Sequence, residues 1–290
     1  MTTAAARSPQ SGNALAFAFV QPLTAELSRG KVDLPSFPDI ALRVRQVLAD
    51  ENITQDKVVQ VVASEPALAA RLMQIANSAA LNFTGKPVTE LRTAIARMGF
   101  NVVRGASIAF SMSQLKEVAS LKGLEKPLDD LWKRSAAVAA MSHAVARTFS
   151  RVNPDTAMLT GLVHGIGELY ILTRSTQHPG LFADYAAYHS IVRHWRSSAA
   201  KALLESWGMA EEIVTAVIQY EDFQRQNEGK VDLTDVLTVG YLLASFKDQT
   251  IELNLHDVAA CKRMGIDRAS LRLIDDTEYE IDTLRQALGV

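Results

Sequence analysis

Apolar side chains recur at three- and four-residue steps along much of the chain, which is the spacing of one buried helix face. The first such stripe consists of Phe37, Ile40, Ala41, Val44, Val47 and Leu48. Ser36 can cap this helix, and Pro38 suits its first turn. A later stripe that follows Pro66 consists of Leu68, Leu72, Ile75 and Ala76. With a further short helix capped by Thr54, the pattern predicts three short helices before residue 78.

Glycine, proline and small polar residues mark the ends of the predicted helices that follow. Thr89 starts a helix that Gly99 can end as a C-terminal cap, and Asn101 starts the next one. Further along, Asn153-Pro154 and His178-Pro179-Gly180 interrupt the apolar stretches. Helices are predicted over residues 182–206, 210–224 and 233–247, and in the charged tail from residue 269 onward.

Strand signals are missing, since no Asn-Gly turn lies between alternating runs. The sequence therefore predicts an all-α fold. Residues 120–127 are the best candidate for a boundary between two helical lobes, at about 31–120 and 127–230. Residues 1–30 are expected to be a leader with a short helix, and residues 231–290 a C-terminal helical extension. The pattern leaves open whether that extension belongs to the second lobe or is an interaction tail.

Composition narrows the function classes. The 290 residues carry a net charge of -2, so no overall positive field attracts nucleic acid or an anionic membrane. The single cysteine, Cys261, fits a reducing compartment and excludes zinc sites built on paired thiolates. The sequence contains no run of about 18 apolar residues, so no membrane span is predicted. Neither a P-loop, nor a dinucleotide fingerprint, nor the Gly-x-Ser-x-Gly elbow of serine hydrolases occurs.

Six segments, in this order, resemble motifs of HDOD domains, which are related to HD-type metal phosphohydrolases. They are residues 34–38 (LPSFP), 65–72 (EPALAARL), 76–79 (ANSA), 91–99 (LRTAIARMG), 161–169 (GLVHGIGEL) and 207–213 (WGMAEEI). The resemblance covers roughly residues 30–225. It implies a multi-helix HD-like fold and a bacterial, cytoplasmic role in signal transduction. HDOD proteins often act alongside cyclic-dinucleotide, chemotaxis or two-component modules, which implies a signalling protein partner.

The same resemblance implies that the HD metal site is degenerate. HD enzymes hold divalent metal with histidine and carboxylate ligands, and the metal activates the attacking water. Here Gly165 follows His164, where the family's dyad aspartate would stand. The other family histidines would fall at Arg134, near Arg196, and near Tyr220-Glu221. We therefore expect no catalytic metal, no cofactor and no enzymatic activity.

Two groups of residues remain as weaker candidates for a site. His164 and Glu168 have i, i+4 helical spacing, and His143 could supply a third metal ligand. The flanking glycines favour close helix packing instead, and a packed histidine is the simpler interpretation of His143. A second group, Arg92, Arg97 and Arg104, could line an anionic-ligand or partner surface, although a solvated helix face is the simpler interpretation.

Three functions follow from these observations. The leading hypothesis is a non-catalytic regulator or scaffold whose two lobes present a groove to a partner protein. The second is a metal-dependent nucleotide phosphohydrolase with the non-standard ligands His143, His164 and Glu168. The third is a nucleotide-binding sensor that uses the arginine cluster without chemistry.

Overall fold

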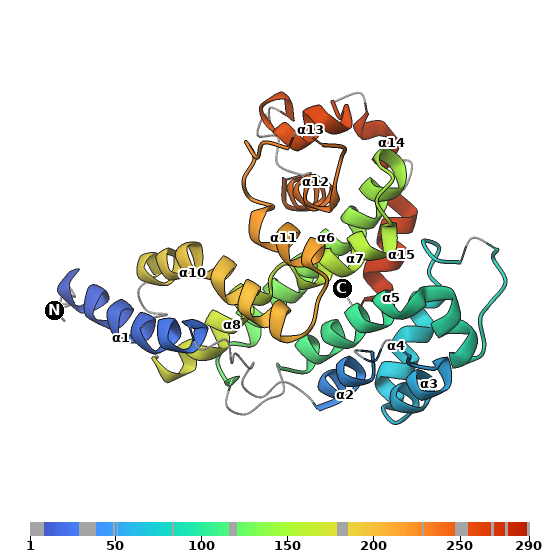
Figure 1. Cartoon of the computed structure of the whole chain (residues 1–290), viewed down its shortest axis with the longest axis horizontal. Coiled ribbons are helices and arrows are strands. Elements are labelled where there is room, and N and C mark those ends of the chain that lie inside the picture. The colour runs from blue at the N-terminus through green and yellow to red at the C-terminus, as the bar shows by residue number, and fades with distance from the viewer. Residues whose placement is uncertain are drawn as a thin grey trace, which may run out of the picture.

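The predicted helical class is confirmed by the computed structural model of the chain (Figure 1). The structure describes residues 9–28, 39–48, 50, 52–82, 84–115, 121–178, 185–227, 229–246, 255–267, 270–275 and 278–288. Within these ranges every regular element is a helix and no strand occurs. No helix among the described residues is both long and apolar enough to cross a bilayer.

The first lobe packs three short helices against one long helix. Its elements are α2 (Asp39–Leu48), α3 (Gln55–Ala63), α4 (Pro66–Ala76) and α5 (Leu91–Gln114). Pro66 occupies the first turn of α4, as predicted, and Leu68, Leu72 and Ile75 of its apolar stripe are fully buried. The proposed start at Ser36 and Pro38 lies outside the described residues. α5 contacts α2, α3 and α4, so this lobe is built around it (Figure 1).

The helix break predicted at Gly99 is a kink inside α5. Gly99 has φ 70° and ψ 167°, while the residues on both sides are helical. Residues with a side chain rarely adopt this conformation, but glycine has no Cβ to clash with the backbone. The two predicted helices therefore run end to end as one bent element, and the bend lets its second half reach toward the second lobe.

The second lobe surrounds the long helix α6. Its elements are α6 (Glu125–Phe149), α7 (Pro154–Val163), α8 (Ile166–Arg174), the short 3₁₀ helix η3 (Ser175–Gln177), α10 (Tyr185–Ser206), α11 (Glu211–Gln219) and α12 (Leu233–Phe246). α7 and α12 both pack along α6. Small residues permit this close approach, because a Cβ on Gly161 would lie 2.5 Å from Cα of Ala139, and one on Gly240 would overlap Ser142.

The two lobes share a core. α5 packs against α7 and, to a smaller extent, α6. At Gly105 of α5 a Cβ would lie 2.8 Å from Cδ1 of Leu159 on α7. Parts of the connections predicted between elements, residues 116–120 and 179–184, lie outside the described residues.

The chain ends add helices to this frame. α1 (Pro9–Ser28) is longer than the short helix that the sequence predicts, and it packs against α10 (Figure 1). After α12 come η4 (Leu255–Asp257), α13 (Ala259–Met264), α14 (Leu271–Asp275) and α15 (Glu278–Ala287). α12 contacts α6, α7 and α11, and α15 contacts α6 and α4. The described part of the region after residue 230 therefore packs directly on both lobes.

Candidate functional site

The segment that resembles the HD motif lies at the junction of α7 and α8. Asn153 caps α7, since its side-chain oxygen accepts the backbone N–H of Asp155 at 2.8 Å and of Thr156 at 3.0 Å. His164 is the C-terminal cap of α7, and Gly165 is the N-terminal cap of α8. This sharp connection between two short helices directs the His164 ring into the second lobe.

His164 is a buried, neutral histidine. Its Nδ1 lies 2.7 Å from the carbonyl oxygen of Gly161, which can only accept, so Nδ1 carries the proton. Burial lowers the pKa of His164 to about 3, and the charges of Arg134 and Arg196 act in the same direction. The ring packs edge-on against Tyr220, with centroids 5.5 Å apart, and tilted against Tyr241 at 6.0 Å.

Two arginine–glutamate pairs lie beside this histidine. Arg134 of α6 pairs with Glu168 of α8. Arg196 of α10 pairs with Glu221, which follows α11. Burial opposes the charge of Arg134, but the carboxylate of Glu168 outweighs it, so the pKa of Arg134 is raised. The pairs therefore join four different segments across the site with charge-assisted hydrogen bonds.

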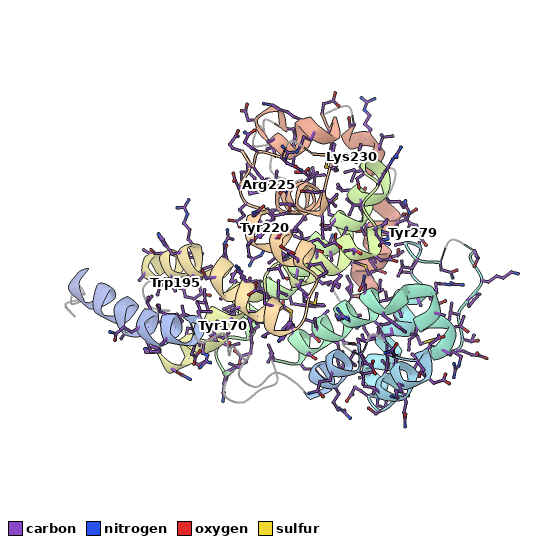
Figure 2. The ribbon with its side chains drawn as sticks, viewed as in Figure 1. Tyr170, Trp195, Tyr220, Arg225, Lys230 and Tyr279 are labelled. Atoms are coloured by element: carbon purple, nitrogen blue, oxygen red, sulfur yellow. The ribbon has the colours of Figure 1, made fainter. Side chains whose placement is uncertain are left out.

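Arg196 also contacts an aromatic ring. Its Cζ lies 5.6 Å from the centroid of Tyr220, and its Nη1 donates to the Tyr220 hydroxyl at 3.3 Å. Burial raises the pKa of Tyr220 to about 12, so the hydroxyl stays protonated at neutral pH. Tyr220 itself lies between α10 and α12, near the middle of the molecule (Figure 2).

These groups surround a cavity of about 390 Å³. It is lined by Arg134, Glu168, His189, Val192, Arg193, Arg196, Tyr220, Glu221 and Tyr241. The positions at which the resemblance places the HD histidines, Arg134, Arg196 and Tyr220-Glu221, thus all meet at one cavity next to His164. The family resemblance points to Arg134, Arg196 and Tyr220-Glu221, and the structure adds His189, Arg193 and Tyr241 to the same lining.

A regular spacing could have identified two of the added residues. His189, Arg193 and Arg196 stand at i, i+4 and i+7 on α10, which places them on one helix face. Tyr241 has no comparable signal, because it comes from α12, an element predicted only as an apolar helix.

The glycines of the motif are packing positions, as the sequence indicates. A Cβ on Gly165 would lie 2.9 Å from Cδ1 of Leu131 and 3.2 Å from Oγ of Ser135. A Cβ on Gly167 would overlap the carbonyl oxygen of Arg196. The space that a dyad aspartate would need at position 165 is therefore occupied by side chains of α6.

The residues at this site do not fit a divalent metal. A metal of the HD type needs several imidazole and carboxylate ligands, and the described residues contain no group of three or more His, Cys, Asp or Glu placed to share an ion. His143, His164 and Glu168 are accordingly not brought together as a ligand set. The guanidinium groups of Arg134 and Arg196 also repel a cation.

His143 lies elsewhere on α6. It is 4% exposed, and its Nε2 is 4.0 Å from Oδ1 of Asp155. Burial, followed by the charge of Arg147, lowers the pKa of His143 to about 4. It is a packed neutral histidine.

The arginine group of the first lobe has structural partners. Arg92 pairs with Asp56. Arg97 donates from Nη1 to Oδ1 of Asn82 at 2.7 Å, and Arg104 donates from Nη2 to the carbonyl of Leu48 at 2.8 Å. Burial lowers the pKa of Arg104. The kink at Gly99 separates Arg104 from the other two, so the three arginines serve local contacts within the lobe.

Comparison with known proteins identifies the fold. The model of the HDOD domain family matches residues 34–223. A structure from Shewanella amazonensis SB2B, provisionally named a metal-dependent phosphohydrolase, is 23% identical in sequence and has a TM-score of 0.78. The match covers 95% of this chain and 99% of the Shewanella chain. A Geobacter sulfurreducens HDOD domain protein is 19% identical, with 97% and 98% covered and a TM-score of 0.58. No curated protein matches the sequence significantly.

Proposed function

The chain belongs to the HDOD domain family, and on that premise we propose that it is a non-catalytic signal-transduction regulator of the bacterial cytoplasm that acts through contact with a partner protein. The observation that carries the proposal is the cavity beside His164. Positions that would hold metal ligands carry Arg134 and Arg196, each paired with a glutamate. A site of this composition holds helices together rather than a metal ion.

The ion pairs give the degenerate site a structural role. Arg134 connects α6 to α8, and Arg196 connects α10 to the segment after α11. Both pairs are about one-third exposed or less at the carboxylate, so solvent screens them only in part. A frame fixed in this way presents constant surfaces to a partner, which is the property that a scaffold needs.

Metal content and hydrolysis test the proposal together. Protein purified without chelator from medium supplemented with manganese and iron is expected to carry substoichiometric metal. It is also expected to leave a phosphodiester substrate uncleaved when divalent metal is added. Tightly bound metal at one or more ions per chain, or a hydrolytic activity that His164→Ala removes, would contradict a non-catalytic role.

The name of the Shewanella amazonensis structure raises the alternative of a metal-dependent phosphohydrolase. At 23% identity that likeness shows the fold alone. Catalysis would require a ligand set other than His143, His164 and Glu168, because His143 lies apart from the other two. The hydrolysis assay described above is the test of this alternative as well.

A nucleotide-binding sensor is a second candidate, and the size and lining of the cavity favour it. About 390 Å³ lies within the range of about 300–1,000 Å³ typical of small-ligand pockets. Arg193, His189 and two tyrosines could contact an anionic aromatic ligand. Titration with cyclic dinucleotides, before and after Arg193→Ala, tests this candidate, and no binding by the parent protein would remove it.

A further inference from the structure

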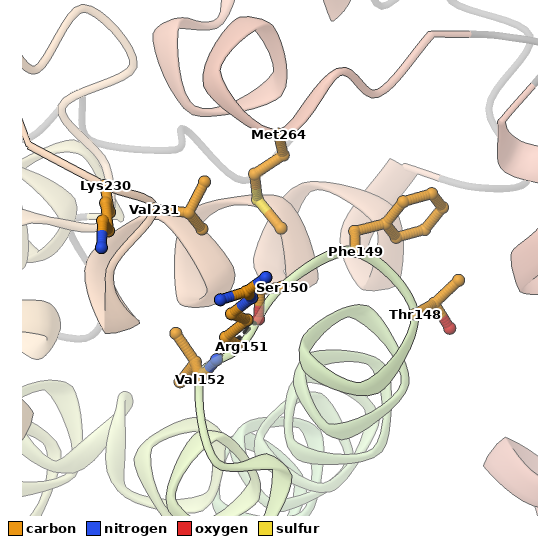
Figure 3. Close-up of a pocket in the computed structure, with 8 residues that line it drawn as sticks. All are labelled: Thr148, Phe149, Ser150, Arg151, Val152, Lys230, Val231 and Met264. Carbon is orange, nitrogen blue, oxygen red and sulfur yellow. Dashed lines mark hydrogen bonds between the residues drawn. The ribbon is translucent and has the colours of Figure 1, made fainter.

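A groove of about 880 Å³ lies at a different place in the second lobe from the cavity beside His164. One wall is the end of α6 with the segment that joins it to α7, and the other is the segment that leads into α12 together with the end of α13 (Figure 3). The residues that matter here are Phe149, Arg151, Val152, Lys230, Val231 and Met264. The Met264 side chain extends from α13 toward the opposite wall (Figure 3).

The groove has an apolar lining on both walls. Phe149 and Val152 come from one wall, and Val231 and Met264 from the other. Phe149, Val152 and Val231 pack against the hydrophobic core but remain partly accessible. Phenylalanine and methionine are enriched in protein interfaces, and methionine adapts its shape to different partners. The lining can therefore receive apolar side chains.

The charged side chains that line the groove are all positive. Arg151 and Lys230 are exposed, and no carboxylate is among the lining residues. In the part of the chain that the structure describes, neither cation has a carboxylate within 4 Å. The neighbouring arginines differ in this respect. Arg147 pairs with Glu280, and Arg225 and Arg263 both pair with the buried Asp235.

The walls are held in place by hydrogen bonds. Ser150 donates from Oγ to the carbonyl of Ala146 at 2.9 Å and accepts the N–H of Val152 at 3.1 Å. On the other wall, Asn227 donates to the carbonyl of Lys230 at 3.3 Å. A groove whose backbone is fixed before binding loses less conformational entropy when a partner docks.

We propose that this groove docks an acidic amphipathic segment of a partner protein, whose carboxylates pair with Arg151 and Lys230 and whose apolar side chains lie on Phe149, Val231 and Met264. The inference rests on the proposed function, since it locates the surface through which the regulator contacts its partner. Charge complementarity identifies the occupant, because cations that have no carboxylate partner among the described residues favour carboxylates. The apolar lining favours a peptide over a fully hydrated anion.

The surface continues beyond the groove. Arg147, in the last turn of α6, binds Glu280 of α15, which brings the neighbouring Tyr279 to the same end of α6. Tyr279 is 75% exposed, and among the described residues it and Leu273 are the exposed large apolar side chains. Exposed apolar side chains beside a charged groove are typical of an interaction surface.

Peptide selection tests the docking site. A display library of short random peptides is selected on the full chain, with the double variant Arg151→Glu/Lys230→Glu as counter-selection bait. We expect enrichment of peptides with Asp or Glu next to Leu, Phe or Met. A selected peptide should bind about tenfold more weakly to the double variant and to its own Gln/Asn-substituted form, and more weakly at high salt.

Lys57→Glu is the matched control, because Lys57 is an exposed cation on α3 in the other lobe. It should leave peptide affinity unchanged. A Met264 methyl resonance that shifts on peptide addition would locate the contact. Peptides that lack acidic residues, or that bind the double variant equally well, would overturn the proposal. Displacement of the peptide by inorganic phosphate alone would also overturn the proposal, because Arg151 and Lys230 would then form a site for a small anion.

Failure of the docking site and failure of the proposed function are distinguishable. Metal content and phosphodiester hydrolysis report on the cavity beside His164, where neither Arg151 nor Lys230 lies. Peptide selection reports only on the groove. A protein without hydrolytic activity that selects no acidic peptide would lose the docking site and keep its non-catalytic role.

Discussion

Gly167 of α8 lies directly against the backbone of Arg196 on α10: a Cβ on this glycine would overlap the Arg196 carbonyl oxygen and lie 2.8 Å from its carbonyl carbon. The contact explains why two helices joined by a long connection hold a fixed relative position. It also sets where the Arg196 guanidinium meets Glu221 and Tyr220. The glycine therefore positions the site without touching the cavity.

Gly167→Ala is accordingly expected to destabilise the protein by about 3 kcal/mol or more, since the added methyl group meets backbone that can move only with α10. Urea unfolding gives this value. Gly229→Ala is the control: the nearest atom there is a side-chain oxygen of Asn227 at 3.2 Å, in an exposed loop. Its effect should be within about 0.5 kcal/mol. Equal stability of the two variants would show that α10 is not fixed by this contact.

The Arg134–Glu168 pair should show measurable coupling. A double-mutant cycle with Arg134→Met and Glu168→Gln isolates the interaction, because each single change removes one charged partner. The side chains are 38% and 27% exposed. The expected coupling is therefore about 1 kcal/mol, between the values of surface and buried pairs. Lys201→Met with Glu205→Gln, an exposed pair on α10, is the control and should couple by about 0.3 kcal/mol. Additive effects at Arg134 and Glu168 would remove the structural role assigned to the pair.

Much of the helical fold follows from local sequence rules. Pro66 and Asn153-Pro154 start helices where capping and proline preferences place them, and Gly99 bends α5 where a C-terminal cap is predicted. These features depend on a residue's own backbone preferences and its nearest neighbours, so a single sequence is enough to locate them.

The ion pairs of the site could not be foreseen in the same way. Arg134 and Glu168 are 34 residues apart, and their meeting depends on how α6 and α8 cross. That crossing is set by contacts such as those of Gly165, at the start of α8, with Leu131 and Ser135 of α6. Family resemblance located the positions around the cavity, but not the partner of each charge. Tyr241 enters the site from α12, which local patterns do not connect to His164.

Acid should destabilise the protein through its two buried histidines. The pKa of His164 is lowered to about 3 and that of His143 to about 4, against 6.5 for an ordinary histidine. Below pH 6.5 the unfolded chain binds protons at these two positions that the folded chain does not bind. The contribution of each histidine to stability is therefore present above about pH 6.5, and it is lost as the pH drops toward 4 for His143 and toward 3 for His164. Each histidine should contribute a loss of about 2 kcal/mol between pH 7 and pH 5.

Urea midpoints at pH 7 and pH 5 measure this loss. His164→Gln should make the difference smaller by about the contribution of one histidine. His194→Gln is the control, because His194 is exposed. A pH dependence that His164→Gln leaves unaltered would mean that folding does not lower the pKa of this ring.

Restoring the missing aspartate should not restore a metal site. Gly165→Asp places a Cβ against Leu131 and Ser135, so we expect a destabilisation of about 2 kcal/mol. Leu131→Ala in the same chain makes room for the carboxylate. Even then, manganese should not raise Tm, because Arg134 and Arg196 keep their positive charges beside the site. A metal-dependent rise in Tm for either variant would show that the arginines do not exclude a cation.

The docking of α1 should depend on Glu26. This carboxylate accepts a hydrogen bond from the Tyr170 hydroxyl and lies 2.8 Å from Nη2 of Arg174, whose Cζ is 5.3 Å from the Tyr170 ring centroid. Glu26→Gln keeps the size of the side chain but removes the charge that Arg174 faces. Because α1 otherwise contacts mainly α10, the loss should be local and about 1 kcal/mol.

Hydrogen exchange resolves this local effect, which global unfolding does not. Amides of α1 should exchange faster in Glu26→Gln by about fivefold, while those of α6 and α7 keep their protection. Glu205→Gln removes an exposed pair with Lys201 and should leave α1 unchanged. If α1 kept its protection in Glu26→Gln, its contacts with α10 would be sufficient to hold it. If α6 and α7 lost protection as well, α1 would instead unfold together with the core of the second lobe.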